Sequence, residues 1–178
     1  VEDLRTLSMA DAGELKLSMQ PCEASDLLER SARAFAHEAR QKSIRIEVES
    51  QPDLPAVQLD AQRMGQVLAN ILENALRYTP EGGHIRMSAA RLADEIELRV
   101  QDSGPGVAVA ELDRIFERFY RTEGSRSRAR GGSGLGFAIA RSLVERHNGR
   151  IWAESGPGQG LAVVIRLPLA PPGETKSA

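Results

Sequence analysis

Hydrophobic residues recur with helical spacing between residues 64 and 80, near the middle of the chain. Counted from Met64, apolar side chains stand at i, i+3, i+4, i+7, i+8 and i+11, which is the pattern of an amphipathic helix. Asp60 is a suitable N-cap, and Pro80 ends the pattern. The sequence therefore predicts a helix that buries one face and turns the other outward.

Three polar residues follow one edge of the apolar face of this predicted helix. At about 100° per residue, Asn70, Asn74 and Arg77 fall together in a narrow stripe. Two carboxamides and a guanidinium, half sheltered by the core, suit a metal-bound anion. Taken alone, the stripe has a simpler interpretation, which is a solvated helix face.

The other helices follow from the same periodicity. Residues 24–41, and the segment opened by residues 131–136, each carry an apolar stripe, and Asn148 begins a left-handed stop at the end of the latter. Residues 1–12 look like the tail of a longer helix with too little chain to bury its apolar side. Residues 13–21 look like a linker.

Strands are predicted where apolar and polar residues alternate, with a hairpin turn at 93–95. These runs are residues 44–48, 85–89, 96–100, 151–154 and 161–167, with a shorter strand near Val57. Residues 107–115 indicate a short helix, and residues 122–132, rich in Ser, Arg and Gly, indicate a mobile loop. From Pro168 onward the composition indicates a disordered tail.

Asp102 continues the alternation of the preceding strand, so its carboxylate points to the same face as Leu98 and Val100. An aspartate is rarely buried without a partner, because desolvating an ionised carboxylate costs more than packing returns. Two interpretations stay open: the side chain caps local backbone at the turn, or it awaits a hydrogen-bond donor from a ligand.

The composition is that of a globular protein and excludes several classes. The 178 residues are 41% hydrophobic and 27% charged, and the net charge of −2 gives no general attraction to nucleic acid or to acidic membranes. Cys22 is the one cysteine, so the chain has no internal disulfide, which fits a reducing compartment. We find no apolar run that would span a bilayer and no signal peptide, and a start at Val1 suggests a fragment.

Positive charge is concentrated between residues 114 and 130, where six arginines stand against two glutamates. In a slightly acidic chain this is a directed anion-attracting patch. Nucleic acid is the weaker interpretation of its target, because few aromatic residues are interleaved to stack bases.

A glycine-rich segment, residues 131–136, runs into the predicted third helix. Glycines let the backbone N–H groups and the positive end of a helix dipole approach a phosphate closely. The spacing is neither a P-loop nor a Rossmann fingerprint, and alone it is equally well a hinge. Combined with Asn70, Asn74 and Asp102, it describes one nucleotide site, in which Asn74 ligates Mg²⁺ and Asp102 accepts from the adenine amine.

Four motifs in this order resemble those of the catalytic ATP-binding domain of bacterial sensor histidine kinases, in the wider group shared with gyrase, Hsp90 and MutL. The segments similar to the N, G1, F and G2 boxes are Asn70-Ile-Leu-Glu-Asn74, Asp102-Ser-Gly104-Pro-Gly106, Phe116-Glu-Arg-Phe119-Tyr and Gly132-Ser-Gly134-Leu-Gly136. The boxes cover roughly residues 60–140, and flanking elements match the family fold to about 168. The stretch 116–136 most resembles envelope-stress sensors of the BaeS type.

The resemblance implies an α/β (α+β) two-layer sandwich, the Bergerat or GHKL ATP-binding fold, with three main helices over one face of a mixed, mostly antiparallel sheet. The nucleotide would lie between the N-box helix and a mobile lid. By resemblance, Asn74 binds Mg²⁺ and Asn70 supports the metal or the phosphates. Arg77 and Tyr78 approach the phosphate and ribose, and Asp102 reads adenine.

The resemblance also assigns roles to the glycine boxes and to the lid. The further nucleotide-binding residues are Gly104, Gly106, Gly132, Ser133, Gly134, Leu135 and Gly136. Arg118, Arg121 and Arg126 are candidates for the γ-phosphate, and Arg118 and Arg121 join Asn70 and Arg77 as candidate catalytic residues. The segment ending at Gly160 is a rough version of a third glycine box and receives no role.

One residue separates kinases from ATPases in this group. In the ATPases a glutamate one helical turn before the metal-binding asparagine activates water, and here that place holds Asn70, which cannot act as a base. Glu73 lies to the far side of the stripe. The pattern therefore favours phosphoryl transfer to a histidine. An ATPase of the same fold, and a docking module without catalysis, remain the alternatives.

The phosphoacceptor histidine is expected outside this chain. His37 imitates the acceptor motif but lacks the following Thr-Pro, and His84 and His147 are interpreted as structural, the latter at a helix C-terminus where a cation is favourable. The expected domains are the end of a dimerisation helix with its linker (1–20), the catalytic ATP-binding domain (21–170) and a disordered tail (171–178).

The expected partners are ATP, the acceptor-histidine dimerisation domain and a response regulator, without nucleic acid. The fragment is expected to be soluble and cytoplasmic, as part of a homodimeric parent anchored in the inner membrane.

Overall fold

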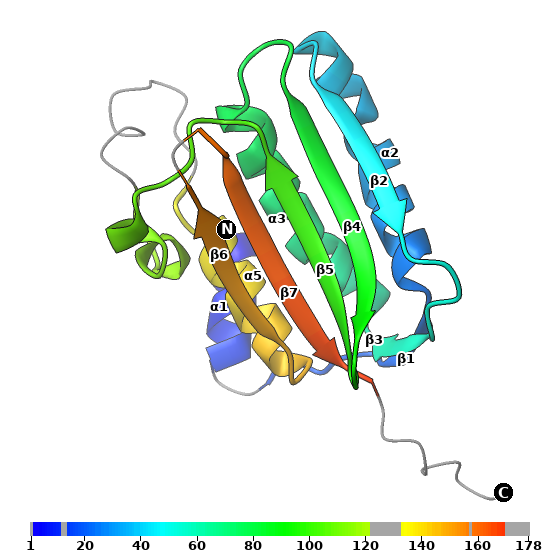
Figure 1. Cartoon of the computed structure of the whole chain (residues 1–178). Helices are drawn as coiled ribbons and strands as arrows, with labels where there is room; N and C mark the ends of the chain where they lie inside the picture. The colour runs from blue at the N-terminus through cyan, green and yellow to red at the C-terminus, as the bar shows by residue number, and fades with distance from the viewer. Residues whose placement is uncertain (1, 12–13, 122–132, 157, 170–178) are drawn as a thin grey trace, which may run out of the picture.

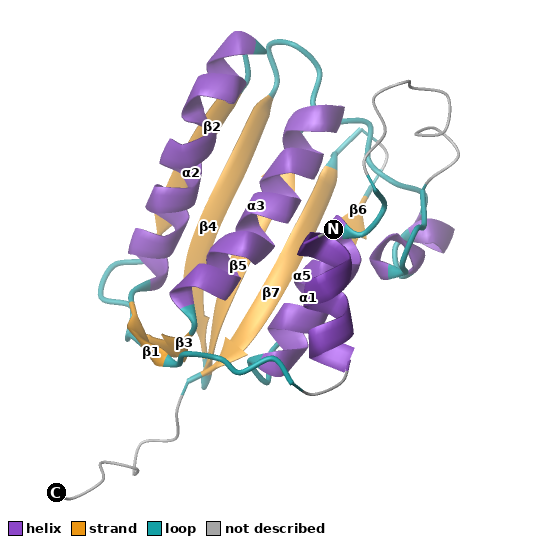
Figure 2. Cartoon of the chain, turned by 180° about the vertical axis from the view of Figure 1, so that it is seen from behind, coloured by secondary structure: helices purple, strands orange, loops and turns teal. Residues whose placement is uncertain are grey.

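Helical and alternating segments meet in one core in the computed structural model, which describes residues 2–11, 14–121, 133–156 and 158–169. The helices lie on one face of a five-stranded sheet, as Figures 1 and 2 show from opposite sides. The helices are α1 (Glu2–Asp11), α2 (Ala24–Gln41), α3 (Ala61–Tyr78) and α5 (Gly136–Arg146). The expected layer of three main helices is therefore confirmed as α2, α3 and α5.

The large sheet has the strand order β2-β4-β5-β7-β6. Its strands are β2 (Arg45–Ser50), β4 (His84–Leu92), β5 (Glu95–Asp102), β6 (Arg150–Ser155) and β7 (Leu161–Pro168). Strands β2 and β4 are parallel, and every other neighbouring pair is antiparallel. Two short strands, β1 (Gln20–Cys22) and β3 (Val57–Leu59), pair separately at one end of the molecule (Figure 1).

Helix α3 lies at the centre of the helical layer, and it has the N-cap and the buried apolar stripe that the sequence predicts. The carboxylate of Asp60 accepts a hydrogen bond from the backbone N–H of Arg63 (3.0 Å), so Asp60 is the N-cap as predicted. The apolar stripe that begins at Met64 is buried along the whole helix, and Pro80 follows its end. The core thus fixes which way the polar edge of α3 faces.

The first residues pack on the domain more closely than their sequence pattern predicts. Leu7 of α1 is buried, because α1 packs along α5, although Leu4 stays exposed. The predicted linker is attached to the domain: Leu15 is buried, its carbonyl accepts from the Arg146 guanidinium, and residues 20–22 form β1. A segment without helical or alternating pattern can still be fixed by contacts with distant elements.

Alternation along the strands produces two different faces. In β5 every second residue from Ile96 to Asp102 is buried against the helices. On the outer face, the ion pair Arg166–Glu97 connects the neighbouring strands β7 and β5, and Arg99–Glu154 connects β5 with β6 across β7. Within the described ranges, no helix has both the length and the apolar character to cross a bilayer.

The segment after β5 differs from the expected short helix. Residues 107–115 contain a 3₁₀ turn, η1 (Val109–Glu111), and the start of another, η2 (Arg114–Phe116). The two turns form a small lobe beside the sheet, in yellow-green in Figure 1. The predicted loop at 122–132 and the predicted tail at 171–178 lie outside the described residues.

Candidate functional site

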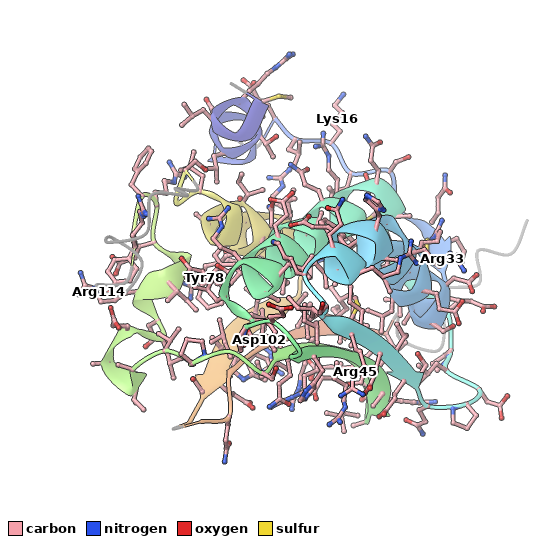
Figure 3. All side chains as sticks on the ribbon, turned by 90° about the horizontal axis from the view of Figure 1, so that it is seen from above. Lys16, Arg33, Arg45, Tyr78, Asp102 and Arg114 are labelled. Atoms are coloured by element: carbon pink, nitrogen blue, oxygen red, sulfur yellow. The ribbon has the colours of Figure 1, made fainter. Side chains whose placement is uncertain are left out.

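A cavity of about 420 Å³ opens between the C-terminal half of α3, the end of β5, the η1–η2 lobe and the start of α5. This volume is in the range of small-molecule sites. It is lined by Asn70, Glu73, Asn74, Arg77, Tyr78, Asp102, Pro105, Gly106, Val107, Ala108, Glu111, Ile115, Tyr120, Arg121, Ser133, Gly134, Gly136, Phe137 and Leu161. Figure 3 shows Asp102 between the helices and the sheet, with Tyr78 on the neighbouring helix.

The polar stripe of α3 reaches this cavity as predicted. Asn70, Asn74, Arg77 and Tyr78 all line it, one or two helical turns apart. The amide group of Asn70 donates from Nδ2 to the carbonyl of Gly136 (3.1 Å), and this bond orients the Asn70 carboxamide. The stripe is therefore half sheltered by the adjoining start of α5.

Glu73, which the helical spacing places to the far side of the stripe, also borders the cavity and is exposed there. The cavity is wide enough to reach past the stripe to the next position around the helix. The presence of a carboxylate at this border gives the ATPase alternative a residue to test.

Asp102 is buried at the end of β5, with only 5% of its surface exposed. Its Oδ1 accepts from the backbone N–H groups of Gly104 (2.8 Å) and Leu161 (3.2 Å). Among the described residues no hydrogen bond reaches Oδ2. Burial raises the pKa of Asp102 and outweighs the two backbone hydrogen bonds, which lower it. The first interpretation of Asp102 is therefore confirmed, since one oxygen caps local backbone. The second, a hydrogen bond from a ligand to the other oxygen, stays a prediction.

The segment before β7 was given no role, and the structure makes it part of the site. Leu161 supplies the second donor to Asp102, and Gly160 packs directly on the Asp102 backbone. A Cβ at Gly160 would stand 1.9 Å from the Asp102 carbonyl oxygen, and its φ of +72° is also left-handed. Only glycine fits there. The rough third glycine box was the one available signal.

Ser155 connects this segment with the glycines that follow Asp102. Its hydroxyl donates to the Gly160 carbonyl (2.7 Å) and accepts from the Val107 N–H (2.9 Å). Gly106, with φ +76°, leaves room for that hydroxyl, since a Cβ there would be 2.5 Å from it. These contacts fix the course of the chain along one wall of the cavity.

The predicted nucleotide-binding residues of the glycine boxes differ in whether they line the cavity. Gly134 and Gly136 line the cavity together with Ser133, whereas Leu135 is buried beneath it. Gly104 is not a lining residue and acts through its N–H bond to Asp102. Gly132 lies outside the described residues.

The predicted arginines are divided among three outcomes. Arg121 lines the cavity, while Arg118 is exposed and is not among the lining residues. Arg126 lies outside the described residues. Arg114 of the η1–η2 lobe, which is labelled in Figure 3, stacks on the Tyr120 ring with its guanidinium carbon 4.5 Å from the ring centre.

The aromatic and apolar wall of the cavity was missed. Ile115, Tyr120 and Phe137 line it, and Phe137 packs on the buried Phe116 with ring centres 5.5 Å apart. Glu111 completes this wall through a hydrogen bond from the Tyr120 hydroxyl. No periodicity marks Glu111, Ile115 and Tyr120, because the lobe has no regular element longer than one turn, whereas Phe137 lies in the first turn of α5.

The three histidines lie away from the lining residues of this cavity. His37 is exposed on α2 beside Gln41, as predicted, and His84 begins β4. His147 is buried, and its Nε2 accepts from the N–H of Asp60 (3.0 Å). Its Nδ1 lies 2.7 Å from the carbonyl oxygen of Leu143 in the same helix.

The donor set suits a hard cation that is shared with a ligand. Within the described part of the chain, no three His, Cys, Asp or Glu side chains gather as metal ligands. Two carboxamides at the cavity offer neutral oxygen donors, which are too few to hold an ion alone. Mg²⁺ typically keeps several waters and takes its remaining ligands from substrate phosphates, so the residues present fit it.

Comparison with known proteins identifies similar chains. A family model described as histidine kinase-, DNA gyrase B- and HSP90-like ATPase matches residues 59–171. Signal transduction histidine-protein kinase BaeS of Escherichia coli K12 is 44% identical over 169 residues, 95% of this chain and 36% of BaeS. The alginate biosynthesis sensor protein KinB of Pseudomonas aeruginosa is 34% identical over 95% of this chain and 28% of its own length. The chain spans about a third of these relatives.

Solved structures agree with this result. Full-length ShkA in complex with AMPPNP superposes with a TM-score of 0.85 at 30% identity, over 95% of this chain and 35% of ShkA. The Acinetobacter baumannii histidine kinase AdeS gives a TM-score of 0.78 at 26% identity, over 94% of this chain and 76% of that one. The predicted fold and the predicted resemblance are both confirmed.

Proposed function

Because the chain belongs to the histidine kinase-, DNA gyrase B- and HSP90-like ATPase family, we propose that it is the ATP-binding catalytic domain of a sensor histidine kinase. It binds ATP and presents the γ-phosphoryl group to a histidine on a dimerisation helix outside this chain. One observation carries the proposal: the stripe of α3, the half-satisfied Asp102 and the start of α5 meet in one cavity.

Asp102 recognises adenine in this proposal. The exocyclic amine donates to Oδ2, which no described residue occupies, while the amides of Gly104 and Leu161 hold Oδ1. Because the carboxylate is buried, a hydrogen bond to it is strong and the cost of leaving it unmade is high. Guanine, which carries a carbonyl oxygen at the corresponding position, would face the carboxylate with an acceptor and be rejected.

Asn74 and Asn70 face the phosphates and the metal. Asn74 ligates Mg²⁺, and Asn70 supports the metal or a phosphate with its oxygen, since its amide group is engaged with Gly136. When bound, Mg²⁺ neutralises charge on the β- and γ-phosphates. Arg77 and Tyr78 approach the phosphate and ribose from the next turn of α3.

The phosphate tail lies against the start of α5. Gly134 and Gly136 let the tail approach the N-terminal N–H groups of the helix, with Ser133 and Leu135 beside them and Gly132 completing the hinge. Arg121, which lines the cavity, is the first candidate for the γ-phosphate, ahead of Arg118 and Arg126. Catalysis consists of positioning and charge neutralisation, which dominate phosphoryl transfer.

The nucleophile comes from another chain segment. Asn70 cannot activate water, and among the described residues no histidine lines the cavity. Residues 1–20 are then the end of a dimerisation helix with its connection, and 21–170 the catalytic domain. The parent is a homodimer anchored in the inner membrane, with this part in the cytoplasm, and its acceptor histidine passes the phosphoryl group to a response regulator.

The test is titration of this chain with a non-hydrolysable ATP analogue, with and without Mg²⁺. We expect binding that Mg²⁺ strengthens, and an Asn74→Ala variant in which Mg²⁺ no longer does so. Gln66→Ala is the matched control, because Gln66 is a carboxamide on the same helix that does not line the cavity. Absence of nucleotide binding in the unmodified chain would overturn the proposal.

Phosphoryl transfer separates the kinase from its alternatives. Incubated with ATP and a supplied acceptor-histidine domain, the chain should label that histidine and hydrolyse little ATP alone. Fast hydrolysis that Glu73→Gln abolishes would indicate an ATPase instead. Nucleotide binding without labelling or hydrolysis would indicate a docking module.

A further inference from the structure

Tyr120 forms part of the cavity wall and is held by two side chains of its own lobe. Its hydroxyl donates to Oε1 of Glu111 (2.7 Å), and the Arg114 guanidinium stacks on the ring. The chain has two tyrosines, and both line the cavity: Tyr78 from rigid α3, and Tyr120 from a lobe of single turns. The second ring therefore needs these local contacts to keep its direction.

Glu111 is an unexpected residue in this place. It is half-buried and lines a cavity that, under the proposed function, receives a triphosphate. Charge alone makes a carboxylate unfavourable there, since like charges repel. A carboxylate is, however, a strong acceptor for a phenolic hydroxyl, and 2.7 Å is the length of a well-formed O–H···O bond.

The backbone beside Tyr120 is fixed as well. Phe119 adopts a left-handed conformation with φ 61°, which is rare for a bulky side chain. Its N–H donates to the carbonyl of Gly134 (2.9 Å), and a Cβ at Gly134 would stand 3.0 Å from the Phe119 Cα. The backbone hydrogen bond of Phe119 fixes the position of the chain next to Tyr120, and the hydrogen bond to Glu111 fixes the direction of the Tyr120 ring.

We propose that Glu111 is a positioning residue of the nucleotide site, whose carboxylate holds the Tyr120 ring as a wall of the cavity. This proposal rests on the proposed function, because the wall serves a bound nucleotide. Glu111 acts on the ligand through Tyr120. The hydrogen bond that its carboxylate accepts from Tyr120 outweighs the repulsion between its negative charge and the phosphates.

The test compares the affinity of a non-hydrolysable ATP analogue for Glu111→Ala, Glu111→Gln and Tyr120→Phe. We expect Glu111→Ala to weaken binding about 3- to 10-fold, the range for one lost, partly exposed hydrogen bond. Glu111→Gln keeps an acceptor oxygen and should restore affinity to within about twofold of the unmodified chain. If the charge alone mattered, both substitutions would instead strengthen binding, and that result would overturn the proposal.

A double-mutant cycle measures the coupling between Glu111 and Tyr120 in nucleotide binding. Tyr120→Phe should weaken binding like Glu111→Ala, and the double variant should be no weaker than either single one. Additive losses would mean that the two residues act independently, which contradicts the proposal.

The control variant is Asp113→Ala, because Asp113 is an exposed acidic residue of the same lobe that does not line the cavity and makes no side-chain capping hydrogen bond. Its affinity should equal that of the unmodified chain, and thermal unfolding checks that every variant is folded. If the unmodified chain bound no nucleotide, the proposed function would fail. If it bound and Glu111→Ala were unchanged, only the present inference would fail.

Discussion

Two aspartates are buried at different places in the fold, and they differ in how many of their carboxylate oxygens accept a hydrogen bond. Asp60 is 7% exposed and Asp102 is 5% exposed. Both oxygens of Asp60 are engaged, Oδ1 by the Arg63 N–H and Oδ2 by the Ser18 N–H (2.9 Å). At Asp102 both backbone donors share one oxygen. The two side chains are similarly inaccessible, yet they differ in the supply of hydrogen-bond donors to their second oxygen.

The pKa values of the two carboxyls move in opposite directions. Burial alone would raise the pKa of Asp60, but the backbone N–H groups of Ser18, Arg63 and Gln62 outweigh it and hold the pKa below its usual value. At Asp102 burial outweighs the two backbone hydrogen bonds and raises the pKa. The fold stabilises the first charge and leaves the second in need of a partner.

Asp60 also joins three parts of the chain, which Asp102 does not. Its side chain connects the segment after α1 with the start of α3, and its N–H donates to His147 at the end of α5. We therefore propose that Asp60 serves folding and Asp102 serves binding. Three substitutions and one change of pH would test this division of roles, and the substitution with the largest expected free-energy change comes first.

Gly160→Ala should have the largest effect, because it forces a side chain onto the Asp102 backbone. The left-handed φ and the overlap with the carbonyl oxygen together predict a loss of about 2–5 kcal/mol in the free energy of unfolding. Chemical denaturation measures the loss. Gly158→Ala is the control, since its φ of +70° is equally left-handed but nothing lies within 4 Å of a Cβ there. Equal losses would show that the contact with Asp102 is unimportant.

Asp102→Asn should weaken nucleotide binding without harming the fold. The amide can keep an accepting oxygen toward Gly104 and Leu161, but its NH₂ group then faces the amine of adenine, donor against donor. We expect ATP affinity to fall by about 1.5–3 kcal/mol, roughly 10- to 150-fold, with an unfolding free energy that is unchanged or higher. Calorimetric titration measures the affinity, and unchanged affinity would remove Asp102 from adenine recognition.

Asp60→Ala should do the reverse. Loss of the N-cap bond and of the bond from Ser18 predicts a fall of about 2 kcal/mol in the free energy of unfolding, while nucleotide affinity of the folded protein stays the same. Asp113→Ala is the control, because Asp113 is exposed and makes no capping hydrogen bond. A change of affinity in folded Asp60→Ala would contradict the division of roles.

Acidification should separate the two aspartates with smaller, graded effects. The lowered pKa of Asp60 means that its stabilisation is complete above its unfolded pKa and is lost as the pH falls through its folded pKa. The raised pKa of Asp102 has the opposite sign, since protonation relieves the cost of burying its charge. Nucleotide affinity, which needs ionised Asp102, should therefore decline at a higher pH than the acid limb of folding stability.

Titrations of affinity and of unfolding free energy over the same pH series check this order. In Asp60→Asn the acid limb should become shallower while the pH dependence of binding is retained. Parallel decline of both quantities in the unmodified chain would contradict the assignment.

The parts of the site that lie on regular elements could be predicted, because each follows a local period. The 3.6-residue repeat placed Asn70 and Asn74 beside one another, and the two-residue repeat turned Asp102 inward. The partners of those residues could not be predicted. The N–H of Leu161 donates to Asp102, 59 residues away in sequence, and the N–H of Ser18 donates to Asp60, 42 residues away. Neither pairing leaves a periodic signal.

Short-range sequence patterns by themselves determined the main helices, the strands of the large sheet and the residues of α3 and β5 that face the cavity, because periodicity and turn residues act over a few positions. The tertiary structure decided which buried carboxylate is satisfied, whether the segment after α1 is attached, and which ring completes the cavity wall. Those outcomes depend on how distant segments pack, and packing is settled only when the strand order and the helical layer bring their backbone groups together.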